Sequence, residues 1–184
     1  MEDKYQNKYR ISSSRLAAWD YGSHGLYFIT ICTKNRIRYF GEIENDIQNN
    51  EGNTASLQVT DIGKIAYDNW LRIPTYHPYV EVDEFVIMPD HMHGILFINK
   101  PDKMTWEINK FGAQRNNLAS IVRGYKSSVK QYANINNLEF YWQPGYYDRV
   151  IRSEKEHRNV IQHIFNNPDN WLLGGNSFEN LFTT

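Results

Sequence analysis

The sequence predicts an α+β domain of the ferredoxin-like type, in which helices cover one face of an antiparallel sheet and a further helix follows. Strand-like and helix-like segments alternate in the order β-α-β-β-α-β. The second and third strand-like segments are separated only by Pro89 and Asp90, which is typical of a hairpin. The chain has 184 residues, of which 41% are hydrophobic and 15% aromatic, enough for one domain with a real core.

The first half of the chain supplies the first strand, a helix and the hairpin. Residues 25–34 are β-branched and aromatic, which favours a strand. The Asn-rich stretch 44–56 is polar and is predicted to be a loop. Between residues 60 and 73 apolar side chains recur at helical spacing, and Pro74 is expected to close that helix. Residues 79–88 and 91–100 then form the hairpin.

The second half supplies a helix, a short strand and the final helix. Apolar residues recur with a period of 3.6 from Leu118 to Tyr132, and residues 146–152 read as the fourth strand. Ser153 and Glu156 form a capping-box pair that opens the last helix. A proline ring clashes with a continuing helix, so the helix is expected to end at Pro168.

Composition and charge narrow the class of protein. The single cysteine, Cys32, excludes an intramolecular disulfide framework and suits a reducing compartment. No apolar run approaches the roughly 20 residues of a membrane span, and the polar, charged N-terminus is unlike a secretory signal. The sequence therefore predicts a cytoplasmic protein without a membrane partner, with a basic N-terminal arm (1–24) before one domain (25–184).

Two histidines, His91 and His93, begin an otherwise apolar strand. Residues i and i+2 of a strand face the same side, so the two imidazoles are expected to project together. At a rise of about 3.3 Å per residue their Cβ atoms lie roughly 6.5–7 Å apart, and such a pair can converge on one cation. The alternative is that both side chains bond to backbone or water at the strand end, and the spacing does not decide between the two.

The last helix offers a third ligand. His163 and Asn167 are four residues apart, one above the other on a helix, at the border of its apolar stripe. The side-chain carbonyl of Asn suits a hard divalent ion such as Mg²⁺ or Mn²⁺. Equally, either residue could be a polar group at the edge of a helix, with Asn167 in a helix-terminal role before Pro168.

Several sequence blocks together resemble one family. They are LYFITICTKNR (26–36), EVDEFVIMPDHMHGILFI (81–98), IVRGYKSSVKQYAN (121–134), WQPGYYDRVIR (142–152) and IFNNPDNW (164–171). In combination they are similar to the REP-associated transposase-like proteins, which belong to the single-tyrosine HUH transposases acting on DNA hairpins. The resemblance covers most of residues 8–171.

The resemblance implies a divalent metal, Mg²⁺ or Mn²⁺, held by the HUH histidines, here His91 and His93 with Met92 as the hydrophobic U. It further implies cleavage and joining of single-stranded DNA, in which a tyrosine on the last helix attacks a phosphodiester and stays joined to the 5′-phosphate. In such a reaction the metal polarises the phosphate and the covalent bond conserves energy for rejoining. A side-chain amide four residues after the tyrosine completes the metal site, and Asn167 holds this place.

The chain departs from the family pattern at the nucleophile, because the position expected for tyrosine is His163. One interpretation is a relative that binds hairpin DNA without cleaving it. Another is a substitute nucleophile, with Tyr146, Tyr147 or Tyr132 as candidates. A third gives His163 itself the role of nucleophile or further ligand. From a different class, a ferredoxin-like interaction module with structural histidines is the alternative.

Basic residues predict where DNA would bind. Arg123, Lys126 and Lys130 share one flank of the helix that begins near Leu118, and phosphate contacts of this kind set affinity and register. The N-terminal arm adds Arg10 and Arg15. The net charge of −1 does not oppose this prediction, because a local basic surface can bind phosphate. The oligomeric state is expected to be monomer or homodimer.

Overall fold

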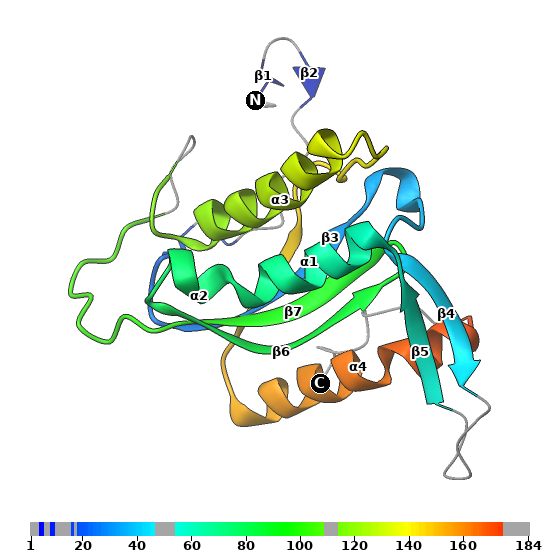
Figure 1. Ribbon diagram of the computed structural model, residues 1–184. Helices are drawn as coiled ribbons and strands as arrows, with labels where there is room; N and C mark the ends of the chain where they lie inside the picture. The colour runs from blue at the N-terminus through cyan, green and yellow to red at the C-terminus, as the bar shows by residue number, and fades with distance from the viewer. Residues whose placement is uncertain are drawn as a thin grey trace.

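A four-stranded antiparallel sheet forms the centre of the computed structural model, which describes residues 4–5, 8–9, 16, 18–46, 54–108 and 114–174. The strand order is β6-β7-β3-β8 (Figure 1), so the first and third strands of the motif lie in the middle. This is the ferredoxin-like arrangement predicted from the sequence, and the prediction is confirmed. The strands are β3 (Gly25–Cys32), β6 (Val80–Met88), β7 (His91–Ile98) and β8 (Tyr147–Ile151).

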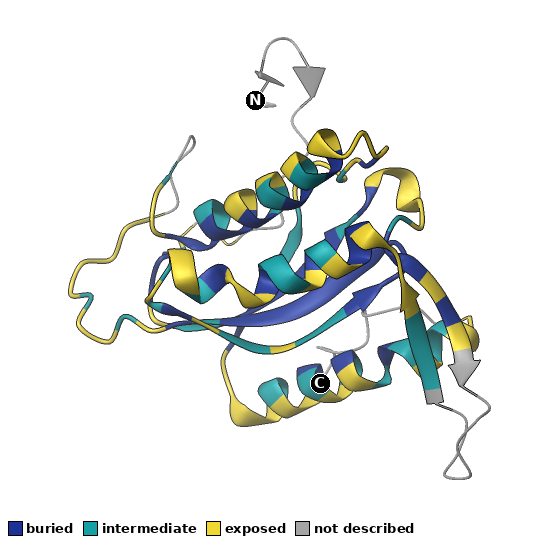
Figure 2. Cartoon of the chain, viewed as in Figure 1, coloured by how far each residue is buried: buried dark blue, intermediate teal, exposed yellow. Residues whose placement is uncertain are grey.

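Helices cover both faces of the sheet (Figure 1). On one face lie α1 (Asp61–Leu71), α2 (Ile73–Tyr76) and α3 (Leu118–Ile135), and on the other lies α4 (Glu154–Leu172). Alternate residues of each strand serve the two faces. Ile29 of β3 belongs to the larger core under α1 and α3, whereas Phe28 packs with Ile95 and Ile164 under α4. Figure 2 shows β7 buried along its length, as expected for a central strand covered on both sides.

The last helix is longer than the sequence predicts. It begins as expected, because the Ser153 side chain accepts a hydrogen bond from the Glu156 N–H at 3.2 Å. The prediction that it ends at Pro168 is wrong, since α4 continues to Leu172. Proline lacks the N–H that would bond to the carbonyl four residues earlier, but this loss is confined to one turn near the helix end. The added turn places Trp171 one turn beyond Asn167 on the same helix face.

A second correction concerns the stretch 44–56, predicted as a loop. Its two ends belong to an antiparallel pair formed by β4 (Gly41–Asp46) and β5 (Thr54–Val59), and residues 47–53 lie outside the described residues. The apolar signal of this pair is too short to predict, because Ile43 and Leu57 are its only inward-packed pair in the described part. The Ala55 N–H donates to Asp169 Oδ1 at 3.1 Å, which joins the pair to α4.

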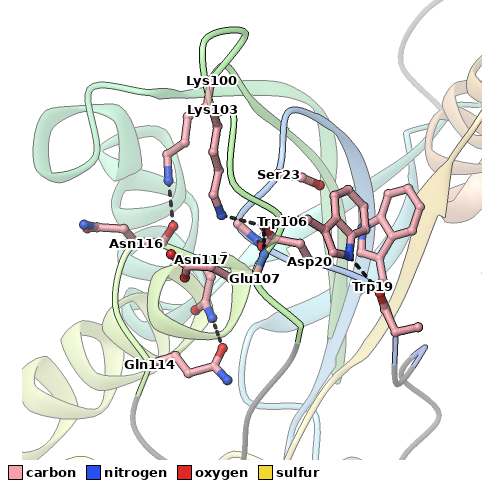
Figure 3. Close-up of polar contacts among 12 residues, drawn as sticks. Trp19, Asp20, Ser23, Lys100, Lys103, Trp106, Glu107, Gln114, Asn116 and Asn117 are labelled. Carbon is pink, nitrogen blue, oxygen red and sulfur yellow. Dashed lines mark hydrogen bonds and ion pairs between the residues drawn. The ribbon is translucent and has the colours of Figure 1, made fainter.

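The segment before β3 is fixed by one buried carboxylate. Asp20 is 3% exposed and accepts hydrogen bonds from the backbone N–H groups of Gly22 (2.8 Å) and Glu107 (2.9 Å) and from the Lys103 ammonium (Figure 3). These contacts bind the loop after β7 to the start of β3. The short strands β1 (Lys4–Tyr5) and β2 (Lys8–Tyr9) pair with each other, and the division at residue 24 stays a prediction.

Among the described residues, no helix is both long enough and apolar enough to pass through a membrane.

Candidate metal and nucleic-acid site

The two histidines of β7 meet beneath α4. His91 and His93 are 3% and 2% exposed, their ring centroids are 4.6 Å apart, and their Nε2 atoms are 3.1 Å apart. Because β7 alternates its side chains between the two faces, both rings project toward the face that α4 covers. The expectation that the two imidazoles project together is therefore confirmed.

The other ring nitrogen of each histidine already has a partner. His91 Nδ1 lies 2.6 Å from Asp90 Oδ1, and an ionised carboxylate only accepts, so this nitrogen carries the hydrogen and leaves a lone pair on Nε2. His93 Nδ1 lies 2.8 Å from the hydroxyl of Thr30, which can donate or accept. His93 can thus either donate from Nε2 to His91 or present a second lone pair beside the first. The two Nε2 atoms, which lie 3.1 Å apart, can therefore present one or two lone pairs to the same ligand.

Helix α4 brings three side chains over this pair. The ring centroid of His163 lies 5.0 Å from that of His93, and the ring of Trp171 lies 6.0 Å from that of His91. Asn167, 3% exposed, sits one turn from both, and its Nδ2 donates to His163 Nε2 at 3.2 Å. Its Oδ1 is buried without a hydrogen-bond partner. An orphaned acceptor costs about 1–3 kcal/mol, so this oxygen is the atom of the site that most requires explanation.

Burial keeps the three imidazoles neutral near pH 7. Burial, followed by the nearby His91 and His163, holds the pKa of His93 well below its ordinary value. Burial also lowers the pKa of His91, although its hydrogen bond to Asp90 acts in the opposite direction, and it lowers that of His163. Neutral imidazole is the form that binds metal ions, so the protonation state suits a ligand role.

Sequence reasoning missed the groups that support the pair from behind. Arg36 Nε lies 3.0 Å from Asp90 Oδ2, so the carboxylate is held between a guanidinium and the His91 ring. Arg36 and Asn35 have φ angles of 56° and 55°, a left-handed conformation that side chains rarely adopt. The available signal was an Asp directly before the first His of the hairpin strand.

The three tyrosines named as substitute nucleophiles lie in different places. Tyr147 is the register partner of Thr30, which is itself the partner of His93, so these residues form one cross-strand row. The Tyr147 ring lies 6.5 Å from Phe28 under α4. Tyr146 packs against the larger core on the opposite face, and Tyr132 belongs to α3 on that same face. The structure brings only Tyr147 of these three onto the face of the histidine pair.

The basic flank of α3 is engaged with the chain's own backbone. Lys126 Nζ donates to the carbonyls of residues 143 and 145 at 2.7 and 2.8 Å, and Lys130 Nζ donates to that of Phe140 at 2.7 Å. Arg123 donates to the carbonyl of residue 114 at 3.0 Å. Burial lowers the pKa of Lys126 to about 8. Arg10 and Arg15 lie outside the described residues, and all five DNA contacts stay predictions.

The described part of the chain contains no metal centre made of His, Cys, Asp and Glu side chains alone. No group of three or more His, Cys, Asp or Glu side chains there is arranged to hold an ion. The donors under α4 are two imidazoles and one amide oxygen, and an amide does not belong to that set.

Comparison with known proteins gives three informative similarities, while no protein-family model matches the chain. An uncharacterized protein of Haemophilus influenzae is 37% identical over 169 residues, covering 86% of this chain and 88% of that protein. The REP-associated tyrosine transposase of Escherichia coli is 27% identical over 98 residues, covering 53% of this chain and 49% of that protein. A solved REP-associated tyrosine transposase bound to a REP hairpin has a TM-score of 0.55 at 20% identity, covering 88% of this chain and 74% of that chain.

The ferredoxin-like sheet with a histidine pair under its terminal helix defines an α+β protein whose fold is shared with a solved REP-associated tyrosine transposase. The solved structure supports the shared fold, and the Haemophilus influenzae protein matches over most of both chains. At 37% identity over most of both chains, this chain belongs to the same family as the Haemophilus influenzae protein, and over about half of its length it is similar to the REP-associated tyrosine transposase of Escherichia coli.

Proposed function

We propose that this protein binds single-stranded or hairpin DNA beside a divalent cation, Mg²⁺ or Mn²⁺, held by His91, His93 and Asn167. The observation that carries the cation is the buried, unpartnered Oδ1 of Asn167, which lies on α4 between His163 and Trp171, the two residues whose rings lie 5.0 Å from His93 and 6.0 Å from His91. The DNA partner is supported by the family, since a REP-associated tyrosine transposase of the same fold has been solved with a REP hairpin.

The donor set fits a hard divalent ion. The two imidazole nitrogens, 3.1 Å apart, are close enough together to bind one cation. An amide oxygen is a ligand that such ions prefer. Asp90 and Thr30 orient the rings from behind, as the outer partners of metal-ligating histidines do.

The chain's own residues would prepare the site for a phosphate. A divalent cation supplies Lewis-acid polarisation of a phosphate oxygen. Phe28 stacks on His93 at 5.4 Å between ring centroids and Trp171 covers His91, so both rings are shielded from water on one side. The side chain of Arg36 is 43% exposed beside the pair and brings positive charge toward an incoming phosphate.

Cleavage is a separate matter from binding, because the residue at the expected tyrosine position is His163, whose Nε2 accepts from Asn167. We therefore propose DNA binding without cleavage by a tyrosine at this position as the first function. A second candidate is an active enzyme that uses Tyr147, and the cross-strand row with Thr30 and His93 is the observation that favours it. In that reaction the Tyr147 oxygen bonds to phosphorus while the bond from phosphorus to the 3′-oxygen breaks, and the phenolic proton ends on the released 3′-hydroxyl.

Calorimetric titration with Mn²⁺ tests the cation site. Wild-type protein should bind one equivalent, and the His91→Ala and Asn167→Ala variants should each lose roughly 10- to 100-fold or more in affinity. His24→Ala, an exposed histidine just before β3, is the matched control and should bind as wild type does. No manganese uptake by folded wild-type protein would refute the cation site and favour a plain interaction module.

A labelled DNA hairpin incubated with Mn²⁺ separates the two functions. The first predicts retention of the hairpin on the protein without a covalent adduct on a denaturing gel. The second predicts an adduct that Tyr147→Phe abolishes and Tyr146→Phe leaves unchanged, because Tyr146 faces the opposite core. An adduct that survives Tyr147→Phe would exclude this tyrosine as the nucleophile.

A further inference from the structure

An exposed tyrosine stands beside the histidine end of the sheet. Tyr141 is 46% exposed, whereas its neighbour Phe140 is fully buried and Trp142 packs against the larger core. Alternation along this extended segment turns Tyr141 outward while its neighbours anchor the chain. The ring of Tyr141 therefore contributes little to the core, and its exposure has no explanation in packing.

Backbone hydrogen bonds connect this ring to the histidine pair. The Lys34 N–H donates to the Tyr141 carbonyl at 2.8 Å, and Thr33 forms a bridge with Trp142. The Thr33 N–H also donates to the carbonyl of Asp90 at 2.9 Å, and Asp90 directly precedes His91. Neighbouring strands lie about 4.8 Å apart, so Tyr141 lies within about 10–15 Å of the pair along this edge.

Two ammonium groups frame the same ring. Lys130 Nζ lies 4.3 Å and Lys34 Nζ 5.3 Å from the ring centroid of Tyr141. Lys34 is exposed and comes from the turn after β3, whereas Lys130 comes from α3. An exposed aromatic ring flanked by cations is the combination that binds single-stranded nucleic acid, in which bases stack on rings while phosphates meet the positive charges.

We propose that Tyr141 stacks on an unpaired base in the single-stranded flank of a DNA hairpin, with Lys34 and Lys130 contacting the adjacent phosphates. This inference rests on the proposed DNA-binding function and names the residues that hold the unpaired part of the substrate. The hydrogen bond from Lys130 to the Phe140 carbonyl holds the ammonium group of Lys130 beside the Tyr141 ring.

Fluorescence anisotropy with tailed and untailed hairpins tests the proposal. Two tailed probes consist of a DNA hairpin with a single-stranded tail of about eight thymidines, attached at one end in the first probe and at the other end in the second. A third probe is the same hairpin without a tail. Titrations are run in EDTA, so that no outcome depends on the cation. Tyr141→Ala should weaken binding of a tailed probe by about 5- to 100-fold, because stacking is lost, while Tyr141→Phe keeps the ring and stays within about twofold of wild type.

The contribution of the lysine contacts to DNA affinity is measured from the dependence of binding on salt concentration. Lys34→Ala should reduce the slope of log K against log salt by about one for the tailed probe. Lys64→Ala, an exposed lysine on α1, is the matched control and should leave the slope unchanged. An equal slope for the Lys34 variant and wild type would remove Lys34 from the proposed contact.

The outcomes separate this inference from the proposed function. If folded wild-type protein binds none of the probes, the DNA-binding proposal fails and the inference fails with it. If wild type binds the tailed probes and Tyr141→Ala binds them equally well, only the stacking inference is overturned. A loss that is the same for the tailed and untailed probes would also overturn it, since stacking on an unpaired base requires the tail.

Discussion

Replacing Asn167 by leucine is expected to stabilise the protein in EDTA while removing its response to manganese. The buried Oδ1 without a partner costs about 1–3 kcal/mol, and leucine of similar size removes that cost. The variant loses the hydrogen bond from Nδ2 to His163, worth about 0.5–1.5 kcal/mol. His163 is partly exposed, so its Nε2 can turn to water. The balance is a gain of about 1 kcal/mol, or a rise of about 2–4 °C in Tm for a chain of this length.

Thermal unfolding in EDTA and in excess Mn²⁺ checks this reasoning. Manganese should stabilise wild type by about 2.7 kcal/mol when it is present at 100 times Kd, and it should stabilise the leucine variant much less. Asn166→Leu, one residue away on α4 and hydrogen-bonded to Gln162 instead, is the control for a helix substitution. A fall in Tm of more than a few degrees for Asn167→Leu in EDTA would refute the argument, because it would mean that the amide is a structural group.

Three further predictions concern the buried carboxylate of Asp20, the glycine in β7 and position 163. Asp20→Asn should lower the free energy of unfolding by about 2–4 kcal/mol at pH 7. Burial alone would raise the pKa of Asp20, but hydrogen bonds, with Lys103 first, lower it below 3.8. The ionised Asp20 carboxylate therefore stabilises the folded protein above about pH 4, and this contribution is lost as the pH falls through the lowered pKa of Asp20. Urea unfolding should show this loss in wild type and not in the variant. Gly94→Ala should cost about 1–3 kcal/mol in urea unfolding, because a Cβ there would lie 2.6 Å from Trp70; unchanged stability would contradict this packing. His163→Tyr should yield a covalent adduct with a labelled hairpin in Mn²⁺ on a denaturing gel, and its absence despite manganese binding would count against 163 as the nucleophile position.

The sheet could be predicted from the sequence because each strand carries its own apolar pattern. The hairpin of β6 and β7 was readable from two such patterns separated by two turn residues, and the alternation on β7 placed both histidines on one face. The pair β4–β5 could not be predicted, because its apolar signal is limited to Ile43 and Leu57, and the hydrogen bond to Asp169 of α4 comes from a distant part of the sequence. A short strand pair with few apolar residues depends on contacts with elements that are distant in the sequence, and a local sequence pattern does not contain those contacts.

The end of α4 shows the same limit in a different form. A local rule places the end of a helix at Pro168, yet the chain continues helical to Leu172 because one missing hydrogen bond near a terminus costs less than tertiary contacts supply. The extra turn matters for the site, since it carries Trp171 onto the ring of His91 and under Arg38, whose guanidinium lies 5.5 Å from the Trp171 ring. A site wall of this kind is predictable only when the helix length is known.

The groups that orient the histidine pair do not include position 163. The orientation of His91 and His93 is fixed by Asp90 and Thr30, which belong to the hairpin turn and to β3. Position 163 belongs to α4 and contributes to none of these bonds. A substitution at position 163 therefore leaves the hydrogen bonds that orient both imidazoles in place. The proposed cation binding and the proposed cleavage depend on different residues, so each needs its own measurement.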